Sequence, residues 1–483
     1  MNAEEHNQTQ NDLSPGGYRE VMRIAWPLIV STGSFTLMMF CDRMFLAWHS
    51  VVAIQAALPA GIIAFTLSCG FMAVAAYAGT FVAQYYGAGD KEGCARAAAQ
   101  GVFMALGSWP VLLLLIPVGA WMLRFSGHAP AVLDAELSYY TILMIGGVTS
   151  PLGAAVSSFF TGMGKTRLTM TANVVANVFN IVLDYGLIFG EWGLPEMGIR
   201  GAAWATVIAG FVSPLILLAV FFSGKINNQF STRRLFRYDH QLFWRMIRFG
   251  FPSGVHLALD IASFSVFVML TGRMGASVLA VSNIALSINL LAFMPLVGLG
   301  IAASILVGQY QGSRQSQHAE RAGWTALKIG IIYMTVIGAS FIVFPEEYYA
   351  CFSARAGGAL LMGPDMLALG RVLLIIMALW GFMDAGNMII GNALKGAGDT
   401  GFVMYYSVAM GWVMLVGGQL LLVLWLGYGI IVAWVWTALY IMVLAVGYLV
   451  RFRRGGWKSI EVIDRPLLIE PTRPAGEAMM VVE

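Results

Sequence analysis

The chain of 483 residues is 59% hydrophobic and only 11% charged, with a formal net charge of +3. Soluble domains hold about 25% charged residues, so this composition excludes a soluble globular protein and indicates a membrane protein. The small positive charge gives no indication of nucleic-acid binding, because the basic residues gather in the loops between hydrophobic stretches.

Hydrophobic stretches long enough to cross a bilayer of about 30 Å recur along the chain. Twelve spans are predicted, at 20–47, 52–83, 97–123, 136–160, 168–190, 200–223, 244–272, 277–307, 322–345, 366–394, 401–426 and 428–450. Residues 1–17 are polar and lack the apolar core of a signal peptide, so we expect a disordered N-terminal tail there.

The distribution of lysine and arginine predicts the orientation. Most of the 28 basic residues fall in the tails and in the loops after even-numbered spans, with Arg233, Arg234, Lys395 and Arg451 among them. Since cytoplasmic loops are enriched in these residues, we expect both termini in the cytoplasm.

The two halves of the chain repeat one template. Gln84-Tyr85-x-Gly87 returns 225 residues later as Gln309-Tyr310-x-Gly312, and Trp26-Pro27 returns as Phe251-Pro252. A second motif, Gly162-x-Gly164-x-Thr166, returns after 234 residues, which places nine extra residues in an outer loop near 345–364.

An even number of spans in each repeat means that both halves enter the membrane from the same side, so they should be related by an axis along the membrane normal. We therefore predict an all-α membrane protein with twelve transmembrane helices in two six-helix lobes. The predicted boundaries are an N-lobe at 18–224, a cytoplasmic linker at 225–243, a C-lobe at 244–452 and a cytoplasmic tail at 453–483. Two such lobes suit alternating access, and no segment resembles a channel filter.

Four carboxylates lie deep in the apolar spans: Asp42, Asp184, Asp260 and Asp384. Acidic residues at such depth are costly and mark ion or substrate paths. They do not recur between the repeats, since Asp42 falls opposite Phe267 and span eleven, the counterpart of span five, has no acid. This asymmetry favours a function over a role in folding.

In span five, a helical period places Asn173, Asn177, Asn180 and Asp184 on one face. The stripe is either a hydrogen-bonded seam between helices or an ion or proton site. The aspartate favours the second interpretation, and the Thr206 hydroxyl of span six is a candidate further oxygen ligand.

In the second half, His256 precedes Asp260 by one turn and Asn387 follows Asp384 on the same face. His256 is either a proton relay or a hydrogen-bonded packing residue. Together with Asn173, Asn177 and Asn283, His256 and Asn387 are the candidate residues of a substrate cavity.

Low dielectric disfavours a charged carboxylate, so a buried acid can exchange its proton for a cation. That exchange is the minimal chemistry of an antiporter. An acidic interior rich in methionine and aromatic residues suits bulky lipophilic cations.

Several motifs, in this order, resemble the multidrug and toxic compound extrusion (MATE) family over about residues 18–452. They are Trp26-Pro27, "FTGMGKT" at 160–166, "NIVLDYGLIFG" at 180–190, "GIRGAAWATVI" at 198–208, "GQYQG" at 308–312 and "LKGAGDT" at 394–400. The resemblance implies a V-shaped pair of lobes that exports organic cations in exchange for protons or sodium ions.

The resemblance also implies roles for individual residues. The family's first-span acid falls on Asp42, the fifth-span pair of the archaeal and DNA-damage-inducible branches on Asn180 and Asp184, and the sixth-span threonine on Thr206. A sodium site is accordingly expected at these four residues. The seventh-span acid, usually Glu, falls on Asp260.

The tenth-span acid of the sodium-coupled branch falls on Asp384. The chain thus has acids that resemble both coupling sites of the family, and the coupling ion, H+ or Na+, stays open. No other cofactor is expected.

The leading hypothesis is a multidrug efflux antiporter, with a lipid-linked saccharide flippase of related architecture as the alternative. A flippase should line its cavity with arginine and lysine, whereas the deep charges identified here are acidic. An intramembrane enzyme is disfavoured because neither HExxH nor GxSxG occurs. The expected partners are organic cations or amphipathic drugs and membrane lipid, without nucleic acid, for a monomer in the bacterial cytoplasmic (inner) membrane.

Overall fold

A computed structural model describes residues 14–353 and 364–464, and within these ranges the chain forms helices and no strand. Twelve of the helical segments are long and apolar enough to cross a membrane, which confirms the number of spans predicted from the sequence. Most of the two expected tails, 1–17 and 453–483, lies outside the described residues. The protein is therefore an integral membrane protein.

The first six spans form the N-lobe, and some of these spans are divided into two helices. Its helices are α2 (Tyr18–His49), α3 (Val51–Ala76), α4 (Ala78–Gly87), α5 (Lys91–Leu114), α6 (Ile116–Phe125), α7 (Pro130–Ile145), α8 (Thr149–Gly162), α9 (Thr166–Phe189) and α10 (Ile199–Phe221). The expected linker contains two short helices, α11 (Gly224–Phe230) and α12 (Thr232–Leu235).

The other six spans form the C-lobe. Its helices are α13 (His240–Gly272), α14 (Ala276–Gly312), α15 (Ser316–Val343), α16 (Pro345–Ser353), α17 (Pro364–Ala397), α18 (Thr400–Ala409), the π-helical η1 (Met410–Gly417) and η2 (Leu420–Trp425), α19 (Ile430–Arg454) and the 3-10 turn η3 (Gly456–Ser459). Helix α16 lies in the outer loop where the sequence places the extra residues of the second half.

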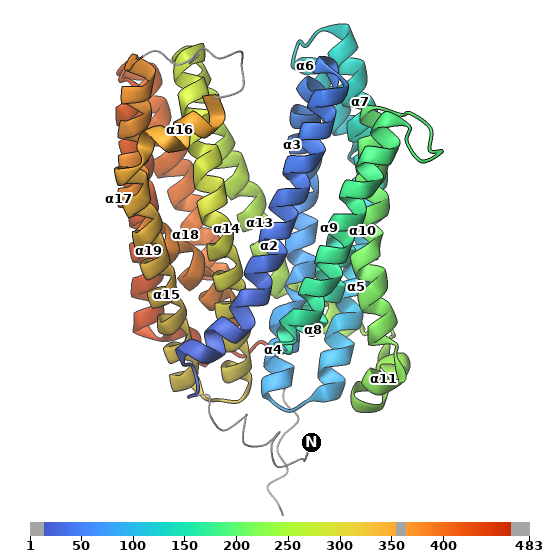
Figure 1. Cartoon of the computed structure of the whole chain (residues 1–483). Coiled ribbons are helices and arrows are strands. Elements are labelled where there is room, and N and C mark those ends of the chain that lie inside the picture. Colours follow the sequence, from blue (N-terminus) through green and yellow to red (C-terminus); the bar gives the residue numbers. More distant parts are fainter. Residues whose placement is uncertain (1–13, 354–363, 465–483) are drawn as a thin grey trace, which may run out of the picture.

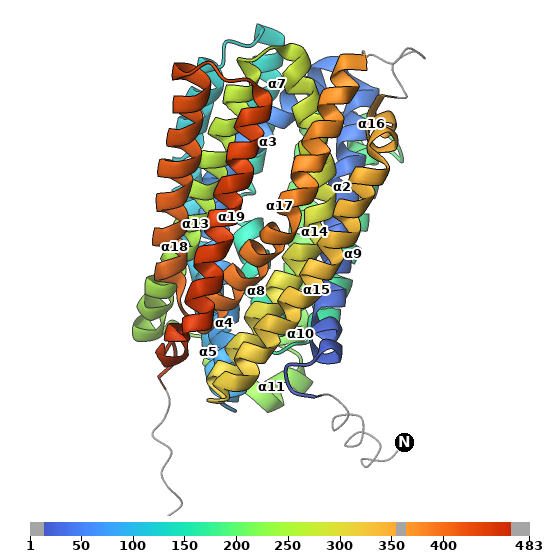
Figure 2. The same ribbon diagram turned by 90° about the vertical axis from the view of Figure 1, so that its left-hand side faces the viewer.

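The two lobes stand side by side and diverge toward one end, as the V shape in Figure 1 shows. We call the end where α2 begins and α19 ends the terminal end, and the end with α6, α7 and α16 the far end. Figure 2, which looks onto the C-lobe, shows that α2 begins and α19 ends at the terminal end. The lobes meet near this end and separate toward the far end.

Helix α2 belongs to both lobes. Its first turns place Val21, Ile24 and Leu28 in the core of the C-lobe, whereas its second half packs against α9 of the N-lobe. Pro27 lies at the transition between these two parts, where a helix-interior proline removes one backbone hydrogen bond and favours a bend. The N-lobe boundary predicted at residue 18 assigns all of α2 to the N-lobe. In the structure, the first part of α2 packs in the C-lobe and the second part in the N-lobe.

Helix α13 repeats this arrangement in the opposite sense. Its first turns place Leu242 and Met246 in the core of the N-lobe, and its later part packs against α18 and η1 of the C-lobe. Pro252 is the counterpart of Pro27. The two lobes thus exchange the first halves of their first helices, so that each lobe helps to bury the other's entry segment.

The repeated motifs bind each other across the lobes. The Gln84 side-chain amide in the N-lobe donates to the Gly396 carbonyl of the C-lobe over 3.1 Å. The Gln309 amide in the C-lobe donates to the Gly162 carbonyl of the N-lobe over 2.7 Å. Because residues 84 and 309, like 162 and 396, are equivalent in the repeat, these two bonds are related by the pseudo-two-fold axis. We call this contact the reciprocal seam.

Two glycines allow the helices of the reciprocal seam to touch. A Cβ atom on Gly87 would collide with the backbone carbonyl of Gln309, and a Cβ atom on Gly312 would collide with that of Gln84. Only glycine permits so close an approach of two backbones. The glycine of each QYxG motif is therefore explained by the seam.

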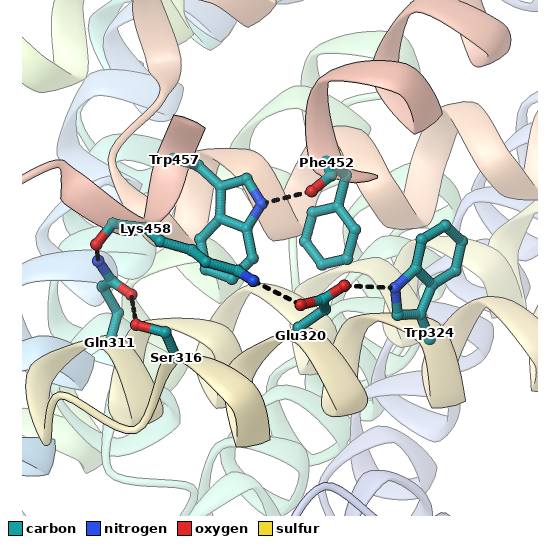
Figure 3. A network of polar contacts seen from close by, with 7 residues as sticks. All are labelled: Gln311, Ser316, Glu320, Trp324, Phe452, Trp457 and Lys458. Atoms are coloured by element: carbon teal, nitrogen blue, oxygen red, sulfur yellow. Dashed lines mark hydrogen bonds and ion pairs between the residues drawn. The ribbon is translucent and has the colours of Figure 1, made fainter. Parts of the chain in front are cut away.

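The chain after α19 folds back onto the C-lobe in a polar network (Figure 3). The Trp457 ring stacks on Phe452 at 5.0 Å, and its indole N–H donates to the Phe452 carbonyl. Lys458 donates to the Glu320 carboxylate over 2.6 Å, and the Gln311 amide donates to the Lys458 carbonyl over 2.7 Å. Part of the segment expected as a tail thus packs against the C-lobe.

The end of this segment reaches the other lobe. Val462 and Ile463 are buried in the N-lobe core, and Asp464 pairs with Arg245 in the first half of α13. With Trp457 in the C-lobe core, residues 456–464 connect both lobes at the terminal end. This connection adds to the reciprocal seam in holding that end closed.

The reciprocal seam gives a first prediction. We expect Gly312→Ala to lower the thermal unfolding temperature of the purified protein, because the new methyl group meets the Gln84 backbone. Overpacking of this kind costs about 1–3 kcal/mol. Tryptophan fluorescence during a thermal ramp measures the effect, and Gly87→Ala should reproduce it from the other lobe.

The matched control is Gly153→Ala in α8, where an added Cβ has no neighbour within 4 Å. It should leave the unfolding temperature unchanged or raise it slightly, since alanine favours helix. Equal changes of the unfolding temperature in Gly312→Ala and Gly153→Ala would contradict the close backbone contact described for the reciprocal seam.

Candidate ion and substrate site

The polar stripe of α9 is partly a seam between helices. Asn173 donates to the Ser31 hydroxyl over 2.8 Å and accepts a hydrogen bond from Ser213 over 2.6 Å. Asn177 donates to Ser34 over 2.8 Å. For these two asparagines the structure favours the packing interpretation, because their side chains fasten α9 to α2 and α10.

The other half of the stripe is different. Asn180 is 1% exposed and Asp184 is 0% exposed, and none of their four side-chain N and O atoms has a hydrogen-bond partner in the described structure. The buried Oδ1 of Asp42 in α2 likewise has none. Buried polar groups are almost always satisfied, so five such atoms indicate a site that holds something else.

Asp42 and Asp184 lie close enough to interact electrostatically, although they are 142 residues apart in the chain. Tyr139 of α7 interacts with both carboxylates and is 6% exposed. Tyr139 could not be singled out from the sequence, because a tyrosine in an apolar span is usually a packing residue. Arg43 is exposed and still interacts with Asp42.

Two like charges in a buried place cannot both remain ionised without a counter-ion. A shared proton or a bound monovalent cation would relieve the repulsion and occupy the unpartnered oxygens. We call Asp42, Asn180 and Asp184 the N-lobe acid cluster.

A sodium ion would take the carboxylate oxygens of the cluster and the amide oxygen of Asn180. The Thr206 hydroxyl donates to the Ala202 carbonyl over 3.0 Å within its own helix, which leaves only its lone pairs for an ion. No group of three or more His, Cys, Asp or Glu residues suited to a metal occurs among the described residues. The donor set therefore fits a proton or a monovalent cation better than a transition metal.

The C-lobe acids form a second cluster, which includes a lysine. The Asp260 carboxylate in α13 interacts with the Lys395 ammonium of α17 and with the Tyr440 hydroxyl of α19. Lys395 also donates to His256 Nδ1 over 3.2 Å. The sequence predicts Lys395 in the loop after span ten, and this is wrong, because the residue lies within α17.

The correction has a physical cause. Helix α17 continues to Ala397, so Lys395 lies in its last turn and its side chain is directed into the lobe. A signal was present in the sequence, since eleven residues, or about three helical turns, separate Lys395 from Asp384 and place both on one face.

Asp384 completes this second cluster. It is 8% exposed, and it interacts with the Asn387 side chain and, electrostatically, with Asp260. Asn283 of α14 is exposed and has no place in this group, since its backbone carbonyl accepts from Ser287 one turn later. We call Asp260, Asp384 and Lys395 the C-lobe charge cluster.

A cavity of about 390 Å³ lies between α3 and α5 of the N-lobe and α13 of the C-lobe. Its lining is almost entirely apolar and includes Phe71, Met104, Phe251 and Val255. None of the buried acids lines it. It spans both lobes and offers an apolar surface of the kind that bulky ligands contact.

Twelve membrane helices in two pseudo-symmetric lobes, each with buried acids, define a membrane transporter rather than an enzyme. The chain belongs to the MatE family, whose model matches residues 27–186 and 252–420. The family resemblance inferred from the motifs is thus confirmed.

Curated relatives extend over nearly the whole chain. It is 25% identical over 454 residues to a probable multidrug resistance protein NorM of Thermotoga maritima, covering 92% of this chain and 94% of the relative. It is 27% identical over 460 residues to a probable NorM of Bradyrhizobium diazoefficiens, with the same coverage. It is 25% identical over 402 residues to the multidrug resistance protein PmpM of Pseudomonas aeruginosa, covering 82% and 81%.

Solved structures show the same fold. An outward-facing multidrug resistance transporter of the MATE family superposes with a TM-score of 0.82 at 19% identity, covering 92% of this chain and 97% of that one. A MOP superfamily transporter from Pyrococcus furiosus superposes with a TM-score of 0.81 at 20% identity, covering 90% and 95%. The predicted two-lobed all-α fold is confirmed.

The difference between the two halves of the polar stripe gives a second prediction. We expect Asp184→Asn to raise the thermal unfolding temperature at neutral pH, because it removes an ionisable carboxyl group that is buried without a hydrogen-bond partner next to Asp42. Asn173→Ala should lower it, because Ser31 and Ser213 each lose a partner, at about 1–3 kcal/mol for a buried group left unsatisfied. Melting of the purified variants measures both, and a loss of stability in Asp184→Asn would contradict the unpartnered environment described here.

Proposed function

We propose that the protein is a secondary active multidrug efflux transporter that exports organic, mostly cationic compounds in exchange for protons or sodium ions. Its relatives from several bacteria are named multidrug resistance proteins or probable multidrug resistance proteins. The single observation that supports ion exchange is the N-lobe acid cluster, with two interacting carboxylates and no hydrogen-bond partner for Asp184.

We propose further that the protein lies in the cytoplasmic (inner) membrane with its terminal end toward the cytoplasm. The excess of basic residues in the loops at that end supports this orientation. The closed reciprocal seam would then face the cytoplasm, and the lobes would diverge toward the outside. In this arrangement, drug would be released to the outside and the coupling ion would enter from the outside.

The proposed cycle follows from charge. An ion or proton that reaches Asp184 from the open side neutralises the cluster and removes the repulsion with Asp42. A cationic drug that interacts with the same negative charges is then bound less tightly, because two cations compete for one pair of carboxylates. The lobes then close toward the outside and open toward the cytoplasm. Loss of the ion to the cytoplasm restores the negative charge that attracts the next drug molecule.

The flippase alternative would need cations free to hold a pyrophosphate. Lys395 is directed into the C-lobe, where it donates to His256 and interacts electrostatically with Asp260. One lysine that already has these partners gives this alternative little support.

Transport by proteoliposomes tests the proposal. Ethidium efflux should be driven by an imposed pH gradient or by an imposed sodium gradient, and the comparison identifies the coupling ion. We expect Asp184→Asn and Asp42→Asn to reduce gradient-driven efflux at least tenfold, a change of about 1.4 kcal/mol.

The matched control is Asp134→Asn in α7, an exposed aspartate outside both clusters. It should transport like the unmodified protein. The role of the N-lobe acid cluster would be refuted by unchanged efflux in Asp184→Asn, and the transport function by the absence of dye efflux under either gradient in the unmodified protein.

A further inference from the structure

The two acid clusters differ in one respect that the sequence did not reveal. In the N-lobe, Asp184 has no hydrogen-bond partner, and its one charged neighbour is another acid, Asp42. In the C-lobe, the Lys395 ammonium contacts His256, one helical turn before Asp260, and interacts electrostatically with Asp260. The buried acid thus interacts with another acid in one lobe and with a lysine in the other.

The position of Lys395 is fixed from two sides. An ammonium group has donors and no acceptor, so in the 3.2 Å contact with His256 the ring nitrogen Nδ1 accepts. His256 is therefore neutral in this contact, with its proton on Nε2. The Tyr77 hydroxyl of the N-lobe donates to the backbone carbonyl of Lys395 over 3.1 Å, which holds this turn of α17 at the junction of the lobes.

The titratable groups that interact with Asp260 or lie one turn from it come from three helices. Helix α13 provides His256, α17 provides Asp384 and Lys395, and α19 provides Tyr440 and Tyr448, both of which interact with Asp260. Among these groups Lys395 is the cation. A second monovalent cation that approached Asp260 would meet the charge of Lys395 at close range, in surroundings where screening by water is weak.

We propose that Lys395, held against His256 one helical turn before Asp260, keeps a positive charge close to Asp260, so that sodium does not bind in the C-lobe and ion coupling falls to the N-lobe acid cluster. The inference rests on the proposed function, because it assigns the coupling ion of that antiport to one lobe. It makes Lys395 a residue that determines ion specificity through its charge.

The assignment has a consequence for Asp384. Its carboxylate interacts with the Asn387 side chain and with Asp260, and Asp260 in turn interacts with the Lys395 ammonium. Removal of that ammonium would leave two interacting carboxylates, an arrangement close to that of Asp42 and Asp184, where Asp42 has the exposed Arg43 beside it. Loss of Lys395 should therefore create a second cation site.

Sodium binding to the purified protein tests this directly. Thermal unfolding is compared in sodium chloride and in choline chloride at equal ionic strength, because a ligand bound to the folded state raises the unfolding temperature. We expect Lys395→Met to gain a sodium-dependent stabilisation, with an apparent affinity at least tenfold higher than that of any C-lobe site in the unmodified protein. The gain should disappear in Lys395→Met combined with Asp260→Asn.

Two further variants separate charge from structure. Lys395→Arg retains the positive charge and should behave like the unmodified protein. Lys395→Gln keeps a donor for His256 without the charge, so it should gain sodium binding even if Lys395→Met folds poorly. In the unmodified protein, any sodium-dependent stabilisation should be abolished by Asp184→Asn and unaffected by Asp260→Asn.

The inference is overturned if neither Lys395→Met nor Lys395→Gln gains sodium binding, or if Asp260→Asn abolishes sodium binding in the unmodified protein. These readouts do not depend on transport. A protein that fails to move ethidium but gains sodium binding in Lys395→Met would refute the proposed function and retain the role of Lys395.

Discussion

The close contact of the two repeats at the reciprocal seam is the constraint on which the rest of the structure depends. Gln84 and Gln309 each reach across to a glycine carbonyl of the opposite lobe, and Gly87 and Gly312 allow the backbones to touch. Because the contact is related to itself by the pseudo-two-fold axis, a rotation that opens one half must open the other. The seam is therefore suited to two discrete states, closed or open, as alternating access requires.

The acids do not follow this symmetry, and the structure shows why the distinction matters. Residues that repeat, such as the glutamines and glycines, lie in the seam that both lobes build equally. Asp184 and Lys395 do not repeat, and they give the two lobes different electrostatics on a common scaffold. A symmetric scaffold can thus provide the movement while each lobe has its own site.

The sequence predicted the fold well because the signal is strong and repeated: twelve long apolar stretches and motifs at constant offsets. It also singled out the acids, since charge in a membrane span is rare. It missed Tyr139 because an isolated tyrosine in an apolar span is indistinguishable from a packing residue. It misplaced Lys395 because a lysine near a span end is typical of a loop, and only the continuation of α17 to Ala397 directs it inward.

The exchanged helices connect the seam to both clusters. Asp42 lies in the second half of α2, beyond Pro27. The first half of α2 is anchored in the C-lobe core. Asp260 lies in α13 beyond Pro252, and the first half of that helix is anchored in the N-lobe core. When the lobes rotate, each helix is held at both ends by different lobes and must bend between them, most readily at its proline. The position of each acid relative to its partners, Asp184 or Lys395, therefore depends on the angle between the lobes, which gives a bound cation a direct mechanical link to the seam.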